Sequence, residues 1–277
     1  MNIVVLCKSW NHKKALEILE ALRQQDLRVR GIVALAAAPK KKTLTDVVRK
    51  THERALANFF NRSSQNGAID GSQNGFDSAL QHLSQSAHLH SDPNPQPRLT
   101  IAEYAKQLQI EMAAVQDLNG EANVAALKNM NTDILLLGGV PIIRANVLAV
   151  PKICVLNVHM GLLPKFRGMN VAEWSIFCGA PVGVTVHQVD AEVDTGAILY
   201  RESIDVSDCP SITAMRAKAS ATQHQALAKC TRLLIEKKLV PEPQKKEDGR
   251  QYYVMHDKLR RIVEYRLSKG YKCISAC

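Results

Sequence analysis

Short apolar segments alternate with amphipathic segments along the first part of the chain. Residues 2–7 are almost entirely apolar and predict a buried strand. Residues 11–25 place apolar side chains at helical spacing, with lysine and arginine on the other side, and a second apolar run follows at residues 28–35. The order strand, helix, strand predicts a right-handed βαβ unit and a parallel sheet.

The same alternation resumes after residue 100. Helical periodicity predicts helices at residues 101–108, 121–130, 171–178, 211–237 and 258–267. Apolar or β-branched runs predict strands at residues 110–115, 132–137, 153–159, 182–189 and 197–206. We therefore expect an α/β protein with a mostly parallel sheet and helices on both of its faces.

The composition changes between these two regions. A helix is predicted at residues 43–60, but residues 61–98 are rich in serine, glutamine, asparagine, glycine and proline, apart from a short helix predicted at 77–83. Such a segment buries little apolar surface. We expect one main domain over residues 1–240 with a mobile insertion at about 61–98, and a short basic C-terminal extension, residues 241–277, packed on the core.

Composition also excludes several classes of protein. The chain has 277 residues, 46% of them hydrophobic, and no apolar run reaches the ~18 residues of a membrane helix. The N-terminal strand lacks the features of a signal peptide. Seven cysteines are scattered without a CxxC pair, which predicts neither a disulfide framework nor a metal site. These features favour a cytoplasmic protein that is not associated with a membrane.

The net charge of +10 has two interpretations. A basic surface alone accounts for it, and attraction to an anionic ligand, a nucleotide or RNA is the alternative. Lysine and arginine are spread along the chain, and aromatic residues make up only 5%. A dedicated nucleic-acid-binding module is therefore not favoured.

The most informative polar residues follow apolar runs in the middle of the chain. Asn157 and His159 end the predicted strand 153–159, and their spacing aims both side chains at one face. In an open parallel sheet, ligands sit outside the carboxyl ends of the strands. An amide and an imidazole there can stabilise negative charge on a carbonyl oxygen and manage a proton. With Asp194 one short segment downstream, these residues predict transfer of an acyl group.

An ordered set of motifs surrounds these residues. It consists of Asn-x-His-x-Gly-Leu-Leu-Pro-Lys-Phe-Arg-Gly at 157–168, Gly-Val-Thr-Val-His at 183–187 and Asp-Thr-Gly at 194–196. Over about residues 100–206 the chain resembles the folate-dependent formyltransferase family, which includes glycinamide ribonucleotide, methionyl-tRNA and amino-sugar formyltransferases. The resemblance implies a Rossmann-like sheet, a catalytic domain at residues 1–240 and 10-formyltetrahydrofolate as the co-substrate.

The resemblance also implies roles for individual residues. Asn157, His159 and Asp194 would be catalytic. Asn157 and a protonated His159 would donate hydrogen bonds to the formyl oxygen while an amine attacks the formyl carbon. The Asp194 carboxylate would favour the charged form of His159 and pass the amine proton to the leaving folate nitrogen. The residues assigned to folate binding are Gly138, Val140, Pro141, Ile142, Ile143, Leu148, Ala191, Glu192 and Val193.

Departures from the family pattern bear on the acceptor. Trp10, Asn11, His12, Gly161 and Arg167 are assigned to substrate binding, and the family usually has serine at the position of Gly161. No glycine-rich phosphate loop follows the first strand, as the ribonucleotide branch would require. The chain after residue 237 is expected to be too short for the C-terminal domain of the tRNA branch. A small amine is therefore expected, either an amino sugar on a nucleotide or an amino-acid side chain such as hydroxyornithine.

Other interpretations stay open. The alternatives are formylation of methionyl-tRNA, hydrolysis of formyltetrahydrofolate to formate, and RNA or partner binding on the same fold. A homodimer is one expectation for the oligomeric state. Outside the catalytic set, His187 is expected to be a hydrogen-bonded structural histidine, and Asp190 is expected to brace its loop.

Overall fold

Strand β1 (Ile3–Cys7) is an interior strand of the sheet and is buried on both faces. Its odd-numbered residues belong to one hydrophobic cluster and its even-numbered residues to a second. Because successive side chains of a strand point to opposite faces, this division shows that the sheet has an apolar layer on each side. The continuous apolar run that predicted a buried strand is explained by this position.

The structure, a computed structural model, describes residues 1–9, 13–36 and 100–274. The chain divides into two compact units, residues 1–36 with 99–277 and residues 37–98, and everything described below belongs to the first. The helices predicted at 43–60 and 77–83 and the insertion at 61–98 lie outside the described residues.

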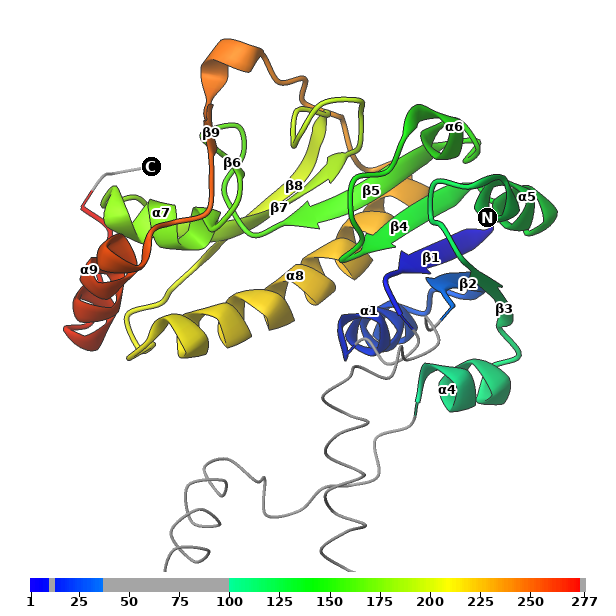
Figure 1. The fold of residues 1–277 in the computed structure, drawn as a ribbon, viewed down its shortest axis with the longest axis horizontal. Coiled ribbons are helices and arrows are strands. Elements are labelled where there is room, and N and C mark those ends of the chain that lie inside the picture. The colour runs from blue at the N-terminus through cyan, green and yellow to red at the C-terminus, as the bar shows by residue number, and fades with distance from the viewer. Residues whose placement is uncertain (10–12, 37–99, 275–277) are drawn as a thin grey trace, which may run out of the picture. The chain divides into compact units, whose positions relative to one another are not determined.

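Within the described residues seven strands form the sheet, in the order β3-β2-β1-β4-β5-β7-β8 (Figure 1). Besides β1 these are β2 (Val29–Leu35), β3 (Glu111–Val115), β4 (Ile134–Gly138), β5 (Cys154–His159), β7 (Val182–Gln188) and β8 (Ile198–Ile204). The strands from β3 to β5 are parallel to one another, whereas β7 is antiparallel to both β5 and β8. The predicted α/β fold with a mostly parallel sheet is confirmed.

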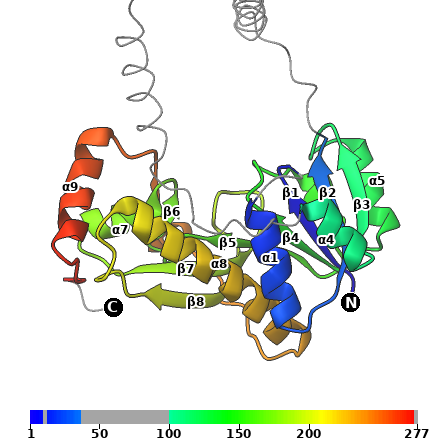
Figure 2. The same cartoon turned by 90° about the horizontal axis from the view of Figure 1, so that it is seen from below.

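Helices cover both faces of this sheet. Helices α1 (Lys13–Gln24), α4 (Ile101–Gln107) and α8 (Ile212–Ile235) contribute to the first hydrophobic cluster, and α5 (Glu121–Asn129) and α6 (Ala145–Leu148) to the second. Figure 2 shows α1 and α8 lying across the sheet on the same side. Side chains fix the starts of two helices: Thr100 and Glu103 form a capping box at α4, and Ser211 accepts a hydrogen bond from the Ala214 N–H at α8.

The C-terminal part of the chain adds short elements around the ends of β5 and β7. Strand β6 (Phe166–Gly168) pairs in parallel with β9 (Arg250–Tyr252), which follows a single 3-10 turn, η1 (Lys246–Asp248). Helix α9 (Asp257–Ser268) packs against α7 (Val171–Phe177). The sequence pattern did not predict α6, β6, η1 or β9, because elements of three or four residues are too short to carry a periodicity.

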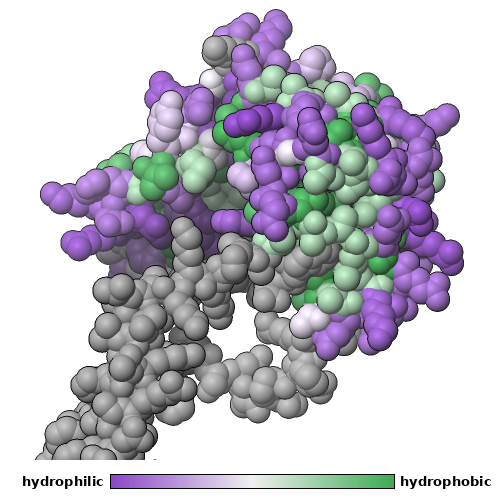
Figure 3. All heavy atoms as spheres, turned by 45° about the vertical axis from the view of Figure 1, so that its right-hand side comes forward, coloured by the Kyte–Doolittle hydropathy of each residue, from purple (hydrophilic) through white to green (hydrophobic). Residues whose placement is uncertain are grey.

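The surface of this unit is mostly polar on the side that carries β3 and α5. Figure 3 shows hydrophilic residues over most of this side, with a band of hydrophobic residues among them. No helix in the described part of the chain is long and apolar enough to cross a membrane.

Candidate active site

The pairing of β5 with β7 brings the predicted residues together. Asn157 and His159 lie on β5, two residues apart, and the antiparallel register places Asn157 opposite His187 and His159 opposite Thr185. Residues directly opposite each other in an antiparallel pair are in side-chain contact. The strand end that the sequence indicated therefore becomes a group of facing polar side chains.

The His159 ring has a polar neighbour on each nitrogen. Its Nε2 lies 2.8 Å from the carbonyl oxygen of Phe166, and its Nδ1 lies 3.4 Å from Oδ2 of Asp194. A carbonyl oxygen only accepts, so Nε2 carries a proton and donates it. The expected role of His159 in proton handling is thereby restricted to Nδ1, the nitrogen that faces Asp194. The side chain is only 8% exposed.

Asp194 lies between two histidines. Its Oδ2 faces His159, and its Oδ1 lies 3.5 Å from Nε2 of His187. The backbone N–H of Gly168 donates to Oδ2 at 3.0 Å, which holds the carboxylate while leaving lone pairs for a proton. Asp194 has a left-handed backbone with φ of 56°, a conformation that Asp adopts more readily than most residues.

His187 orients the Asn157 amide, a role that the sequence analysis did not assign. His187 Nδ1 donates to the carbonyl oxygen of Gln188 at 2.7 Å, so Nε2 of the neutral ring accepts from Nδ2 of Asn157 at 3.3 Å. Burial lowers the pKa of His187 below its ordinary value of 6.5, and the Asp194 carboxylate offsets part of this effect. The neutral form is therefore favoured, and the second hydrogen of the Asn157 amide is left for another acceptor. The expectation that His187 is hydrogen-bonded is confirmed.

Gly161 lies close to Nε2 of the His159 ring. A Cβ atom at Gly161 would lie 3.0 Å from Nε2 of His159 and 2.8 Å from Cγ2 of Val171. Its backbone is not in the left-handed region, so close approach of neighbours, and not turn conformation, requires glycine in this packing. The same turn is held by Thr185, whose hydroxyl donates to the Gly161 carbonyl at 2.7 Å and accepts from the Leu163 N–H at 3.1 Å.

The residues predicted for folate binding follow the end of β4 and form the loop before Asp194. Ile143 is buried in the second hydrophobic cluster, and Val140, Leu148 and Val189 pack against that cluster. Ile142 is 77% exposed and Val193 43% exposed. The predicted folate slot therefore contains apolar side chains that pack on the core and others that are exposed to solvent. Gly138 is buried at the end of β4, and Pro141, Ala191 and Glu192 are exposed.

Asn119 fixes the first of these two segments and was missed by the sequence analysis. Its Nδ2 donates to the Ile142 carbonyl at 3.0 Å, and its Oδ1 accepts from the Arg144 N–H at 2.7 Å. Asp190 fixes the second segment, because its Oδ1 accepts from the Thr195 hydroxyl at 2.8 Å and from the Glu192 N–H at 3.2 Å. The expectation that Asp190 braces its loop is confirmed. In the sequence, only the position of Asn119 in a short turn could have indicated this role, and many asparagines occupy turns without such a role.

Arg167 is buried, with 4% of its surface exposed, although it was assigned to substrate binding. It lines a cavity of about 300 Å³ together with Glu192, Val193, Thr195 and Gln251. One cavity thus joins a residue from the predicted substrate set with two from the predicted folate set. Trp10, Asn11 and His12, the other predicted substrate residues, lie outside the described residues.

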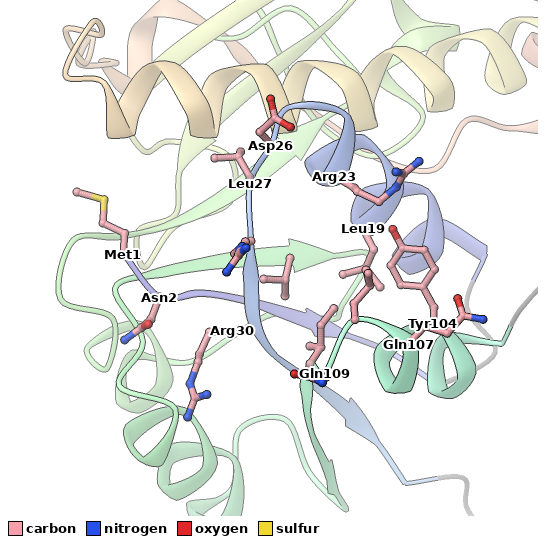
Figure 4. A pocket seen from close by; sticks show the side chains of 14 residues that line it. Met1, Asn2, Leu19, Arg23, Asp26, Leu27, Arg30, Tyr104, Gln107 and Gln109 are labelled. Carbon is pink, nitrogen blue, oxygen red and sulfur yellow. The ribbon is translucent and has the colours of Figure 1, made fainter.

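A larger cavity, of about 970 Å³, lies elsewhere (Figure 4). Met1, Asn2 and residues 28–30 line it, so it opens at the amino ends of β1 and β2. Ligands of open parallel sheets bind at the carboxyl ends. Two of its arginines are also already paired, Arg23 with Glu20 and Arg30 with Glu111. The Asn157–Asp194 region is therefore the candidate active site. In the described residues no group of three or more histidine, cysteine or acidic side chains is arranged to hold a metal ion.

Comparison with known proteins identifies the family. The family model described as formyl transferase matches residues 1–231. This chain belongs to the formyl transferase family. The resemblance inferred from the motifs is confirmed, and the matched residues include all three predicted catalytic residues.

The sequence relatives of this chain extend beyond the region they share with it. The methionyl-tRNA formyltransferase of Deinococcus radiodurans is 31% identical over 147 residues, which are 52% of this chain and 46% of the relative. The methionyl-tRNA formyltransferase of Caldanaerobacter subterraneus subsp. tengcongensis is 29% identical over 158 residues, 56% of this chain and 50% of the relative. The chain spans about half the length of the curated relatives it matches.

Solved structures share the fold. Glycinamide ribonucleotide transformylase 1 from Symbiobacterium toebii superposes with a TM-score of 0.55 at 17% identity, covering 88% of this chain and 95% of its own. A sugar N-formyltransferase from a Shewanella species gives 0.54 at 13% identity, covering 97% and 87%. At these identities the likeness concerns the formyl transferase fold.

Proposed function

We propose that this chain transfers the formyl group of 10-formyltetrahydrofolate to a primary or hydroxylated amine of a small molecule. The observation that carries the proposal is the position of the Asp194 carboxylate, 3.4 Å from Nδ1 of His159, beside an Asn157 amide that His187 orients. Amide, imidazole and carboxylate are the groups that an acyl transfer to an amine needs.

The reaction follows from the contacts of these side chains. The amine nitrogen attacks the formyl carbon, and negative charge develops on the formyl oxygen. The free hydrogen of the Asn157 amide, whose other hydrogen faces His187, stabilises that charge. Asp194, with His159 beside it, accepts the proton that the amine loses. This proton then passes to the folate nitrogen as its bond to the formyl carbon breaks, giving a formamide and tetrahydrofolate.

The donor would be held at the carboxyl end of β4. The apolar base formed by Val140, Ile143 and Leu148 and the exposed Ile142 suit the flat face of a pterin. Backbone groups of residues 191–193 would meet its polar edge. Asn119 and Asp190 keep the two segments in place by the hydrogen bonds described above. Positive net charge suits the anionic tail of the folate.

Asp194→Asn tests the chemistry. An asparagine oxygen still accepts from the Gly168 N–H, so the fold should persist, but the proton acceptor is lost. We expect kcat to fall by roughly 10²–10⁴-fold, measured as tetrahydrofolate release in the presence of an amine. Asp190→Asn is the matched control, since it lies in the same loop and its oxygen keeps the contacts of a brace. Equal activity of Asp194→Asn and the wild type would contradict the proposed roles.

Methionyl-tRNA is a second candidate acceptor, favoured by the names of the sequence relatives. The acceptor is identified by comparing formyl transfer to sugar-linked amines, to hydroxylated amino-acid side chains and to methionyl-tRNA under one set of conditions. Formate release without any amine would instead favour the hydrolase. Salt-sensitive RNA binding without folate binding would favour a binding protein.

A further inference from the structure

A segment near the C-terminus contacts the loop that carries Asp194. Residues 242–252, which we call the C-terminal strap, run from the edge of β8 to β6 (Figure 1). Glu242 and Ile198 exchange two backbone hydrogen bonds of 2.8 Å each. At the other end the Met169 N–H donates to the Tyr252 carbonyl at 2.9 Å. The strap is therefore anchored on both sides of the loop that carries Asp194.

Gln244 is the strap residue that reaches this loop. Its Nε2 donates to the backbone carbonyl oxygens of Asp194, at 3.2 Å, and of Gly196, at 2.5 Å. Its Oε1 accepts from Nη2 of Arg167 at 3.2 Å, and the neighbouring Lys245 carbonyl accepts from the same nitrogen at 2.8 Å. The Gln244 amide thus has partners on both its donor and its acceptor side.

The partners of Gln244 lie on both sides of the hydrogen bond between Asp194 and Gly168. The Asp194 carboxylate is held by the N–H of Gly168, and Arg167 immediately precedes Gly168 on β6. Gln244 therefore connects the backbone of Asp194 to the side chain of Arg167, the residue next to Gly168. A displacement of either end would change the separation between Asp194 and His159.

We propose that Gln244 is a positioning residue that sets the Asp194 carboxylate against His159. Its effect on turnover rests on the proposed formyl transfer, whereas its effect on the geometry of the two side chains does not. If Gln244 only stabilised the fold, weakening the strap at another residue should have the same effect as replacing Gln244. If Gln244 positions Asp194, only the loss of its hydrogen bonds to the Asp194 loop should change the site.

The chain offers a matched control in the same strap. The Glu242 carboxylate forms a bidentate ion pair with Arg201, with distances of 2.6 and 2.8 Å. This pair anchors the strap to β8, and no hydrogen bond of the Glu242 side chain reaches residues 190–196 in the described structure. Glu242→Gln weakens the strap without altering the contacts of Gln244.

Two variants of Gln244 separate its two sides. Gln244→Met keeps the length of the side chain and removes every hydrogen bond. Gln244→Glu keeps an acceptor for Arg167 but replaces the donor to the two carbonyls with a negative oxygen. If Gln244 positions the Asp194 loop, both variants should lower kcat by roughly 10- to 100-fold. The KM for 10-formyltetrahydrofolate should stay within about twofold.

A second measurement does not depend on turnover. The NMR titration of His187 in histidine-labelled protein reports how close the Asp194 carboxylate lies, because that carboxylate raises the pKa of His187 against the effect of burial. We expect the His187 titration to shift in Gln244→Met and Gln244→Glu and to stay unchanged in Glu242→Gln. Absence of formyl transfer in the wild type would refute the proposed function but leave this measurement intact. Wild-type titrations in both Gln244 variants, or shifts of equal size in Glu242→Gln, would overturn the positioning role.

Discussion

Thr185 allows the stability of the catalytic turn to be tested with a single substitution. Its side chain is fully buried, and its hydroxyl accepts from the Leu163 N–H at 3.1 Å while donating to the Gly161 carbonyl at 2.7 Å. Thr185→Val preserves the shape of the side chain but leaves both backbone groups of the turn without this partner. A buried polar group that loses its partner costs about 1–3 kcal/mol. Since valine also adds a buried methyl group, we expect a net loss of about 2–4 kcal/mol.

Thr231 provides the matched control. It is also fully buried, and its hydroxyl donates to the Leu227 carbonyl at 2.8 Å inside α8. That carbonyl keeps its helical N–H partner in Thr231→Val, so we expect a loss below about 1 kcal/mol. The two variants thus differ in the number of backbone groups left unpaired and not in the volume of the substituted side chain.

Chemical denaturation with urea measures the difference. The slope against denaturant should be the same for both variants, because neither changes the surface exposed on unfolding. In a thermal scan each kcal/mol corresponds to about 2–4 °C for a domain of this size. The rate of the proposed formyl transfer should also fall in Thr185→Val, because the turn joins His159 to the Phe166 carbonyl that holds its ring. Free energies of unfolding that agree within about 0.5 kcal/mol for the two variants would refute this reasoning.

Three further changes test other parts of the structure. Arg216→Met should cost about 2–4 kcal/mol by urea denaturation, because it leaves the fully buried Glu173 carboxylate without its bidentate partner at 2.7 and 3.0 Å; a cost below about 1 kcal/mol would contradict this. Burial lowers the pKa of His187 in the folded protein, so as the pH falls His187 is protonated first in the unfolded chain. The contribution of His187 to the free energy of unfolding should therefore be fully present above about pH 6.5 and fall below it by up to about 1.4 kcal/mol per pH unit. His187→Asn should flatten that decline, and an unchanged slope would exclude His187 as its source. A Cβ atom at Gly249 would overlap the Pro164 carbonyl oxygen, so Gly249→Ala should destabilise the fold by at least about 1–3 kcal/mol; a wild-type melting temperature would show that the strap is not packed there as described.

The sequence by itself determined the elements with long patterns and the residue types of the candidate site. Apolar runs of five or more residues are buried strands here because they lie inside a sheet with an apolar layer on each face. The fixed spacing of Asn157 and His159 placed them on one face of a strand, since side chains alternate along β structure. The motif at residues 194–196 identified Asp194 by its type and order, without any information on its distance from the other two.

Only the tertiary structure decided how those residues are arranged. His187 is thirty positions from Asn157 in the sequence and becomes its partner because β7 runs antiparallel to β5. Which nitrogen of His159 can take part in proton transfer depends on a carbonyl from β6, a strand too short to predict. The contact between Gln244 and the Asp194 loop joins residues 50 positions apart. Local patterns specify periodicity and turns, whereas long-range hydrogen bonds depend on strand order and register, which no local pattern contains.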